Sequence, residues 1–281
     1  MKGQIIKAHS SNFVVECEKQ LYNCTARGLL KRGEDGLVCG DYVEFDGKVI
    51  TSICDRKNKF IRPSVSNVDV VIIVVSPTPK PDFHLIDKVV INAVKEDVEI
   101  VFVVNKTDVD DNLYDFICSE YMHCSNMFFR VSAKDKKGII DLKSYLKNKV
   151  CVLSGQSAVG KTSLVNAMFD LSLKTGELSE KILRGRHTTT YSELHAYEDI
   201  KIIDSPGFAV IDADVDIEVL PECYPEYFNI QSGCKFRGCA HVSEPNCAVK
   251  KAVLDGVLSK TRYERYLDIY NELKSKRGLY E

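Results

Sequence analysis

Four runs rich in Val and Ile constrain the fold of this chain most strongly. Two of them, residues 68–76 (VDVVIIVVS) and 98–105 (VEIVFVVN), flank a segment of helical type at 82–96. Two more follow at 149–155 (KVCVLSG) and 200–207 (IKIIDSPG). Strands this apolar are buried on both faces, which is typical of a parallel sheet covered by helices. We therefore expect an α/β domain.

The segments on either side of this domain follow other patterns. Residues 1–62 read as short strands separated by turns, about five in number, which predicts a small closed barrel. An OB fold is the size-matched candidate, and an SH3-like barrel is the alternative. After Pro221 the chain enters a cysteine-rich loop and then helical stretches. We expect three domains: an OB-like barrel over 1–62, an α/β domain over 63–221 and a mostly helical domain over 222–281.

Composition and charge narrow the class of protein further. The net charge is −2, with mildly basic ends and an acidic centre, a distribution that fits outer modules in contact with nucleic acid. The apolar runs are too short to cross a bilayer and no signal segment opens the chain, so we expect a cytoplasmic protein without membrane contact. Eleven cysteines without a regular framework fit reduced thiols and one metal site better than disulfides.

The sequence GQSAVGKT lies between the third apolar strand and a helical stretch. It matches G-x-x-x-x-G-K-[ST], in which the glycines let backbone N–H groups surround phosphates. Lys161 would contact the β and γ oxygens, and the Thr162 hydroxyl would ligate Mg²⁺. The predicted phosphate-binding residues are Gly155, Gln156, Ser157, Ala158, Val159, Gly160, Lys161, Thr162 and Ser163.

A second phosphate motif, Asp-x-x-Gly, ends the last of the four strands. Asp204 would hold the metal through water, and the Gly207 N–H would sense the γ-phosphate. Between the two motifs lies GRHTTT, in the position of a switch region. We take Thr189 as the candidate ligand of Mg²⁺ and the γ-phosphate, with Thr188 and Thr190 as the alternatives.

Two further motifs indicate which base is bound. Asn-Lys-Thr-Asp follows the second apolar strand, and Ser-Ala-Lys follows the apolar MFFRV. The Asp108 carboxylate can accept hydrogen bonds from the N1–H and N2–H₂ edge of guanine, which adenine cannot offer. Asn105 would brace this loop against the phosphate loop, Lys106 would lie along the base, and the Ala133 N–H would approach O6. The candidates are Asn105, Lys106, Thr107, Asp108, Ser132, Ala133 and Lys134.

The order of these motifs differs from that of ordinary GTPases, because here the base motifs precede the phosphate loop. Ligands of parallel sheets bind at the carboxyl ends of the strands, so position in space matters and chain order does not. The termini of compact domains often lie close together, so old ends can be joined and new ones opened elsewhere. The sequence therefore predicts a circularly permuted P-loop GTPase that binds GTP and GDP.

The cysteine-rich loop contains CKFRGCAHVSEPNC, with the spacing C-x₄-C-x-H-x₅-C. Three thiolates and one imidazole would complete the tetrahedral shell of a structural Zn²⁺. A redox pair of cysteines is the alternative, but it leaves the histidine without a role. The predicted ligands of one zinc ion are Cys234, Cys239, His241 and Cys247.

Together these motifs resemble the ribosome small-subunit-dependent GTPase A family of bacteria. The resemblance extends over almost the whole chain, through GDYVEF, IRPSVSNVD, the permuted motifs, GRHTTT, DSPGF and the cysteine loop. It implies an N-terminal OB-like β-barrel, a circularly permuted P-loop GTPase α/β domain and a C-terminal zinc-binding, mostly helical domain. It also implies a role in late maturation of the 30S ribosomal subunit, with the subunit and its 16S rRNA as partners. The subunit would stimulate the hydrolysis of GTP. Ala158 departs from the family, which more often has Gly there, and Ala would be strained at positive φ.

The catalytic group is less explicit in the sequence. Ras-like GTPases orient the attacking water with a Gln after Asp-x-x-Gly, but Phe208 occupies that position. His187 is the candidate for this task, and an RNA-contacting or solvated residue is the alternative reading. We expect a monomer whose hydrolysis of GTP times its release from the subunit. The competing hypothesis is an RNA-binding placement factor that uses GTP as a state marker with little turnover.

Overall fold

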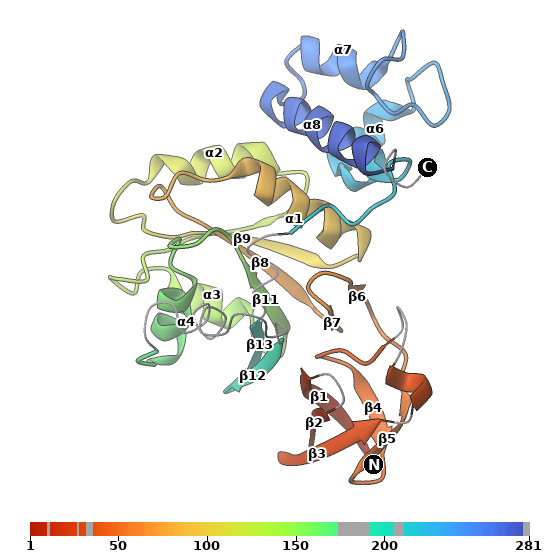
Figure 1. Cartoon of the computed structure of the whole chain (residues 1–281). Helices are drawn as coiled ribbons and strands as arrows, with labels where there is room; N and C mark the ends of the chain where they lie inside the picture. The colour runs from red at the N-terminus through yellow and green to blue at the C-terminus, as the bar shows by residue number, and fades with distance from the viewer. Residues whose placement is uncertain (10–11, 27, 32–35, 174–191, 205–210, 278–281) are drawn as a thin grey trace.

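The computed structural model describes residues 1–9, 12–26, 28–31, 36–173, 192–204 and 211–277. Its centre is a sheet with helices on both faces, flanked by a small barrel and by a helical module (Figure 1). The central strand order is β10-β9-β8-β11-β13-β12, and all neighbours are parallel except β13 and β12. The four Val and Ile runs form β8, β9, β11 and β13, as predicted. The strands are β8 (Val70–Val75), β9 (Glu99–Val104), β10 (Met127–Arg130), β11 (Val150–Ser154), β12 (Glu193–Tyr197) and β13 (Ile200–Asp204).

Strand β8 shows why this sheet needs cover on both faces. All six of its residues are buried, and alternate side chains point to opposite faces. Val71 and Ile73 join one apolar core with α1 and α2, whereas Val70 and Ile72 join a second core with α3 and α4. The helices are α1 (Phe83–Lys95), α2 (Asn112–Tyr121), α3 (Ile139–Tyr145) and α4 (Lys161–Phe169).

Five N-terminal strands close into the predicted OB-like barrel. They follow the order β1-β2-β3-β5-β4, and β4 pairs with β1 to close the barrel. A fully buried carboxylate, Asp41, fastens one end: it accepts from Val38 N at 2.8 Å and Ser66 Oγ at 2.6 Å, and it pairs with Arg56 at 2.7 Å. The elements are β1 (Lys2–His9), β2 (Asn12–Cys17), β3 (Gln20–Ala26), η1 (Gly28–Lys31), β4 (Tyr42–Phe45) and β5 (Val49–Ile53).

The barrel and the central sheet are continuous, which the sequence did not predict. β1 pairs with β12 in antiparallel fashion, with Lys7 opposite Glu193, so that one sheet of 11 strands runs through both. A separate hairpin of β6 (Lys59–Phe60) and β7 (Val65–Ser66) links the barrel to β8. Pairing between residues so far apart leaves no local pattern in the chain.

The C-terminal module packs against the helices of one face of the sheet (Figure 1). Its apolar core includes the buried rings of Tyr224, Tyr227 and Tyr266, and Ile91 of α1 joins this core. The predicted helical stretches are confirmed as α7 and α8. The elements are η3 (Leu220–Cys223), η4 (Pro225–Tyr227), α6 (Phe228–Gln231), α7 (Ala248–Leu254) and α8 (Lys260–Arg277).

A buried ion-pair network fixes the contact between the module and the central domain. Arg262 of α8 donates to Asp87 of α1 at 2.7 Å and pairs with Glu226 of η4. Arg265 pairs with the same Asp87 and donates to Glu120 of α2 at 2.8 Å. Because the loss of one partner would leave a buried charge uncompensated, the network favours a single orientation of the module.

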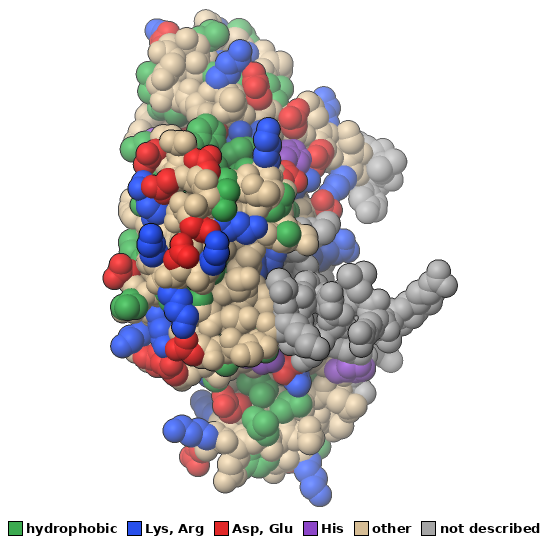
Figure 2. All heavy atoms as spheres, turned by 90° about the vertical axis from the view of Figure 1, so that its left-hand side faces the viewer, with side chains coloured by type: hydrophobic (Ala, Val, Ile, Leu, Met, Phe, Trp, Pro, Cys, Tyr) green, Lys and Arg blue, Asp and Glu red, His purple; other side chains and the backbone are tan. Residues whose placement is uncertain are grey.

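The surface over α2, α3 and α4 is mixed in charge (Figure 2). Several of its charged side chains pair, such as Arg130 with Asp111 at 2.6 Å and Lys143 with Glu198 at 2.8 Å. This face therefore presents no continuous basic surface in that view. In the part of the chain that the structure describes, no helix is both long and apolar enough to span a membrane.

Candidate functional site

The predicted nucleotide motifs meet at one edge of the central sheet. The phosphate loop from Gly155 follows β11, Asn105 follows β9, Ser132 lies just after β10, and Asp204 ends β13. These are the carboxyl ends of parallel strands, where ligands of such sheets bind. The altered chain order therefore leaves the spatial arrangement of the motifs unchanged.

The backbone of the phosphate loop requires its two glycines. Gly155 has φ +136° and Gly160 has φ +99°. A Cβ atom on Gly155 would lie 2.3 Å from Val74 O, and one on Gly160 would lie 2.4 Å from Asn105 Nδ2. Ala158 has φ +64°, so it occupies the left-handed conformation in which the sequence predicted strain.

Asn105 braces the base-binding loop against the phosphate loop. Its Nδ2 donates to Val159 O at 3.0 Å, and its Oδ1 accepts from Ala133 N at 3.1 Å. One buried amide thus connects three motifs. Lys106 adds a second connection, because its Nζ donates to Ala158 O at 2.7 Å.

Asp108 is held in place by the Ser-Ala-Lys motif. Its Oδ1 accepts from Ser132 Oγ at 2.9 Å, and Lys134 Nζ lies 3.9 Å from its Oδ2. Thr107 Oγ1 donates to Val131 O at 3.1 Å and so joins the same two loops. The Asp108 side chain is only 17% exposed, and a carboxylate fixed in this way suits recognition of a donor edge.

Lys161 begins helix α4, and its ammonium group turns back into the phosphate loop. Its Nζ donates to Gly155 O at 2.6 Å and to Gln156 O at 2.7 Å. Burial lowers the pKa of Lys161 to about 8, and the Asp204 carboxylate opposes that shift. A bound phosphate would favour the charged form, because an opposite charge offsets the cost of burial. Thr162 is buried at the next position.

The remaining predicted residues divide into two groups. Ser157, within the phosphate loop, and Ser163, in helix α4, are exposed, whereas Val159 between them is buried. The candidates of the switch segments lie outside the described residues, namely His187, Thr188, Thr189, Thr190, Gly207 and Phe208. Their assigned roles stay predictions.

One contact of the phosphate loop carries no signal in the sequence. Gln156 Oε1 accepts from Asp82 N at 2.8 Å, and Asp82 in turn caps α1 by accepting from Leu85 N at 3.0 Å. An Asp before an apolar helical segment is a cap signal, but nothing local joins it to the phosphate loop. Helix α1 therefore touches the nucleotide site at its start and the C-terminal module through Ile91.

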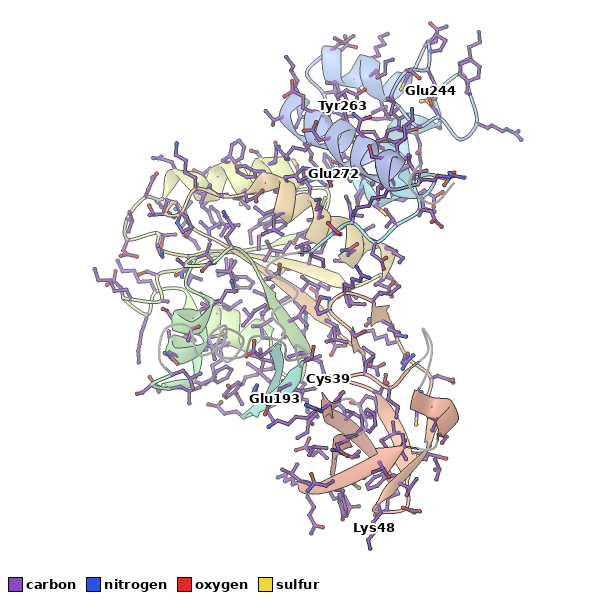
Figure 3. The ribbon with its side chains drawn as sticks, viewed as in Figure 1. Cys39, Lys48, Glu193, Glu244, Tyr263 and Glu272 are labelled. Atoms are coloured by element: carbon purple, nitrogen blue, oxygen red, sulfur yellow. The ribbon has the colours of Figure 1, made fainter. Side chains whose placement is uncertain are left out.

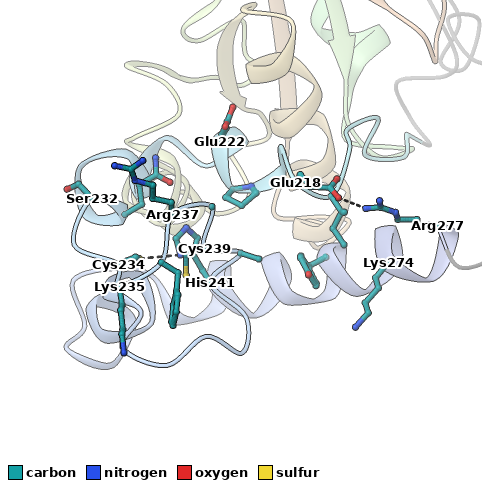
Figure 4. A pocket seen from close by; sticks show the side chains of 17 residues that line it. Glu218, Glu222, Ser232, Cys234, Lys235, Arg237, Cys239, His241, Lys274 and Arg277 are labelled. Atoms are coloured by element: carbon teal, nitrogen blue, oxygen red, sulfur yellow. Dashed lines mark hydrogen bonds and ion pairs between the residues drawn. The ribbon is translucent and has the colours of Figure 1, made fainter.

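The four predicted metal ligands come together in the C-terminal module, and Figure 4 shows three of them, Cys234, Cys239 and His241. The ligand atoms of Cys234, Cys239, His241 and Cys247 all lie within 4.8 Å of one another. His241 Nδ1 lies 3.3 Å from Cys247 Sγ and 3.7 Å from Cys234 Sγ. Three sulfurs and one ring nitrogen form a donor set that suits tetrahedral Zn²⁺. All eleven cysteines are free thiols, as the composition predicted.

The protein around this cluster affects the protonation of its sulfur and nitrogen ligands. Lys250 N donates to Cys247 Sγ at 3.4 Å. Burial raises the pKa of Cys239 to about 12, and burial lowers the pKa of His241. The imidazole is thus held neutral, while the Cys239 thiol needs a nearby positive charge to ionise.

Side chains outside the cluster fix the loop that carries it. The Glu244 carboxylate accepts from Ala240 N at 2.7 Å and from Val242 N at 2.9 Å. Tyr263 Oη of α8 donates to His241 O at 2.7 Å, and Figure 3 shows Glu244 and Tyr263 on this side of the module. The loop is therefore tied to the long helix that contacts the central domain.

The fold and these sites define a circularly permuted P-loop GTPase with an OB-like barrel and a metal-cluster module. The family model described as RsgA GTPase matches residues 53–214, and the one described as RsgA N-terminal domain matches residues 2–51. The chain belongs to the RsgA GTPase family.

Known relatives match along the whole length. The small ribosomal subunit biogenesis GTPase RsgA of Geobacillus thermodenitrificans is 37% identical over 99% of each chain. The small ribosomal subunit biogenesis GTPase RsgA 2 of Listeria innocua is 38% identical over 100% of each. The crystal structure of YjeQ from Thermotoga maritima aligns with a TM-score of 0.79 at 35% identity, covering 97% of this chain and 98% of that one. YloQ, described as a circularly permuted GTPase, aligns with a TM-score of 0.75 at 31% identity, covering 98% and 95%.

Proposed function

We propose that this chain hydrolyses GTP as a late maturation factor of the 30S ribosomal subunit. Relatives named small ribosomal subunit biogenesis GTPases match it from end to end. The observation that carries the proposal is the brace at Asn105, which joins the phosphate loop to both base motifs despite the permuted order. The subunit would stimulate hydrolysis, and loss of the γ-phosphate would release the factor.

Each group of the nucleotide site has a proposed role. Lys161 would contact the β- and γ-phosphates, Thr162 would ligate Mg²⁺, and Asp204 would hold the same ion through water. Asp108 would accept from the guanine edge. His187 would orient the attacking water, since Phe208 stands where Ras-like GTPases have Gln.

The cluster of three cysteines and His241 would hold one structural Zn²⁺. The donor set leaves no position open for substrate, which is typical of structural sites. The ion would neutralise the thiolates and fix the loop between α6 and α7. Its role in this proposal is to order the module, with no part in hydrolysis.

The two outer modules would bind 16S rRNA. The chain would divide into the barrel (1–62), the GTPase domain (63–221) and the zinc module (222–281). The protein would act as a monomer in the cytoplasm, where the subunit matures. The mixed charges over α2, α3 and α4 support the placement of RNA contacts on the outer modules (Figure 2). Such contacts would be made largely to phosphates and would weaken with salt.

Hydrolysis of GTP with and without purified 30S subunits tests the proposal. Stimulation by the subunit is the expected result. The alternative is an RNA-binding placement factor that uses GTP as a state marker. Phe208 favours it, because this residue stands where Ras-like GTPases have the Gln that orients the attacking water. It predicts tight, GTP-dependent binding of the subunit with turnover that the subunit leaves unchanged.

Base selectivity is tested separately with Asp108→Asn. An amide donates where the carboxylate accepted, so this variant should lose affinity for GTP and gain affinity for xanthosine triphosphate. Asp110→Asn is a matched control, because Asp110 Oδ1 accepts from the backbone N of Asn112 at 3.0 Å and from its Nδ2 at 2.9 Å, and an amide oxygen can do the same. Equal binding of ATP and GTP by the unaltered protein would contradict the assignment of Asp108.

A further inference from the structure

The hairpin of β12 and β13 connects directly to both switch segments. β12 begins at Glu193, shortly after GRHTTT in the chain, and β13 ends at Asp204 of the Asp-x-x-Gly motif. The pairing register places Glu193 directly opposite Asp204. The open end of this hairpin is therefore the place where the two switch connections meet the sheet.

The N-terminal barrel contacts the hairpin at this same end. Lys7 of β1 lies opposite Glu193 of β12, and Lys7 Nζ lies 2.6 Å from Glu193 Oε1. Lys7, Glu193 and Asp204 therefore form one row across three strands, with their side chains on one face of the sheet. Figure 3 shows Glu193 beside Cys39 where the central sheet meets the barrel.

The charges in this row give Lys7 a specific task. Two carboxylates directly opposite each other in a sheet repel, and here they are Glu193 and Asp204. The Lys7 ammonium offsets that repulsion from the barrel side. His195 Nδ1 lies 3.9 Å from the same Glu193 oxygen, which is well beyond the distance to Lys7.

A second contact ties the barrel to the other strand of the hairpin. Lys201 Nζ of β13 donates to Oε1 of the buried Gln4 at 2.7 Å, and it lies 3.6 Å from Glu16 Oε2. Polar contacts of β1 and β2 thus reach both strands of the hairpin. A shift of the barrel would be transmitted to the strand ends that carry the switch segments.

We propose that Lys7 is a positioning residue for GTP hydrolysis: through Glu193 it holds the hairpin end that carries Asp204, and so couples the barrel to the switch segments. The idea rests on the proposed function, because binding of the barrel to the subunit supplies the signal. Lys7 itself touches neither nucleotide nor Mg²⁺ in this scheme. Its contribution is to the geometry of Asp204 when the subunit is bound.

A double-mutant cycle of Lys7→Met and Glu193→Gln tests this coupling. The kcat and KM for GTP are measured with and without saturating 30S subunits. In each single variant, the ratio of stimulated to unstimulated kcat should fall at least about fivefold, the lower range of measured allosteric couplings, while KM changes less. The double variant should be no worse than either single one, because both changes remove the same interaction.

The pair Lys2→Met and Glu44→Gln supplies the matched control. These residues also form an ion pair, at 3.7 Å, but it joins β1 to β4 on the exposed surface of the barrel and does not involve the hairpin. Lys2→Met and Glu44→Gln should keep the full ratio of stimulated to unstimulated kcat. Loss of an RNA contact by Lys7, whose side chain is 49% exposed, would raise the subunit Kd of Lys7→Met and would leave Glu193→Gln unaffected.

The outcomes of the double-mutant cycle distinguish the positioning role of Lys7 from the proposed function. Unchanged stimulation in both single variants, or strictly additive losses, would overturn the positioning role while leaving the proposed function intact. Absence of stimulation in the unaltered protein would overturn the proposed function and the coupling with it.

Discussion

The nucleotide site and the metal cluster are both preformed, but their polar groups are satisfied in different ways. In the nucleotide site the groups pair with one another: Asn105 bonds two loops, and Lys161 bonds two carbonyls. In the cluster, sulfurs face one another and face the Nδ1 of His241, which lies 3.3 Å from Cys247 Sγ. The first arrangement can persist without a ligand, whereas the second gains its main stabilisation from an ion.

Removal of the metal should therefore have the largest effect on this molecule. Structural Zn²⁺ contributes on the order of 10 kcal/mol to the folding of small metal domains. We expect Cys239→Ser, or a chelator, to make residues 222–281 sensitive to protease while GTP binding survives. Metal analysis and limited proteolysis measure both parts. Cys223→Ser is the matched control, since Cys223 is buried in the same core outside the cluster.

The pH dependence of metal loss follows from the same groups. Protons compete with the metal for sulfur, and burial raises the pKa of Cys239 to about 12 in the metal-free chain. Chelators should therefore strip the metal faster as the pH falls. Freshly purified protein with clearly less than one zinc per chain, and with an ordered module, would contradict the proposed dependence on metal.

The buried network at Arg262 should give the next largest effect. Arg262→Met leaves Glu226 buried without its arginine partner and leaves Asp87 paired with Arg265 alone, which should cost up to about 3–5 kcal/mol in free energy of unfolding. Lys260→Met on the same helix removes only an exposed pair with Glu264, at 3.8 Å, and should cost less than about 0.5 kcal/mol. Urea unfolding measures both.

Arg262→Met also distinguishes the two interactions that order the C-terminal module, the buried ion-pair network and the bound zinc ion. With zinc retained, Arg262→Met should loosen the module from α1 while the metal loop stays protected from protease. A variant that loses its zinc together with the contact to α1 would show that the network, and not the ion, orders the loop.

Much of both sites could be predicted because their chemistry is local in the chain. The phosphate loop needs glycines at fixed offsets, as the φ values of Gly155 and Gly160 show. The metal ligands fall within one loop, so their spacing alone indicates a tetrahedral set. The circular permutation could also be predicted, because each motif directly follows its own strand.

The contacts that join the modules could not be predicted in this way. Lys7 and Glu193, or Asp87 and Arg262, are far apart in sequence, and each alone reads as an ordinary charged surface residue. Burial and pairing appear only once the strands and helices are packed. β12 was missed for a related reason, since ELHAY is short and lacks the continuous apolar character of the buried strands.

The nucleotide site should respond to pH through Lys161. Burial lowers its pKa to about 8 in the free protein, and bound phosphate should raise it. Below pH 8 both states hold the proton, so affinity should be flat. Above pH 8 binding must take up a proton, so GTP affinity should fall by up to about tenfold per pH unit.

Titration with a fluorescent GDP or GTP analogue between pH 7 and about 9 checks this. Lys161→Arg is the control, because a guanidinium stays protonated throughout that range. Ionisation of guanine itself would weaken both proteins alike. Flat affinity in the unaltered protein would show that Lys161 keeps its proton without phosphate. The charge of the nucleotide site would then be independent of its ligand, which would widen its contrast with the metal cluster.

The smallest effect should come from the strained residue of the phosphate loop. Ala158 has φ +64°, a conformation that costs a non-glycine residue about 1 kcal/mol or more, whereas Gly adopts it freely. The gain in Ala158→Gly is partly offset by the greater freedom of Gly in the unfolded chain, so the free energy of unfolding should rise by less than about 1 kcal/mol. Ala167→Gly in helix α4 is the control and should lower it by about the same amount, because that helical position has no strain to relieve. GTP affinity should change little in Ala158→Gly, since the carbonyl that accepts from Lys106 is retained. If both glycine variants lose stability equally, the loop is relaxed at Ala158, and the preformed site carries no strain for a nucleotide to offset.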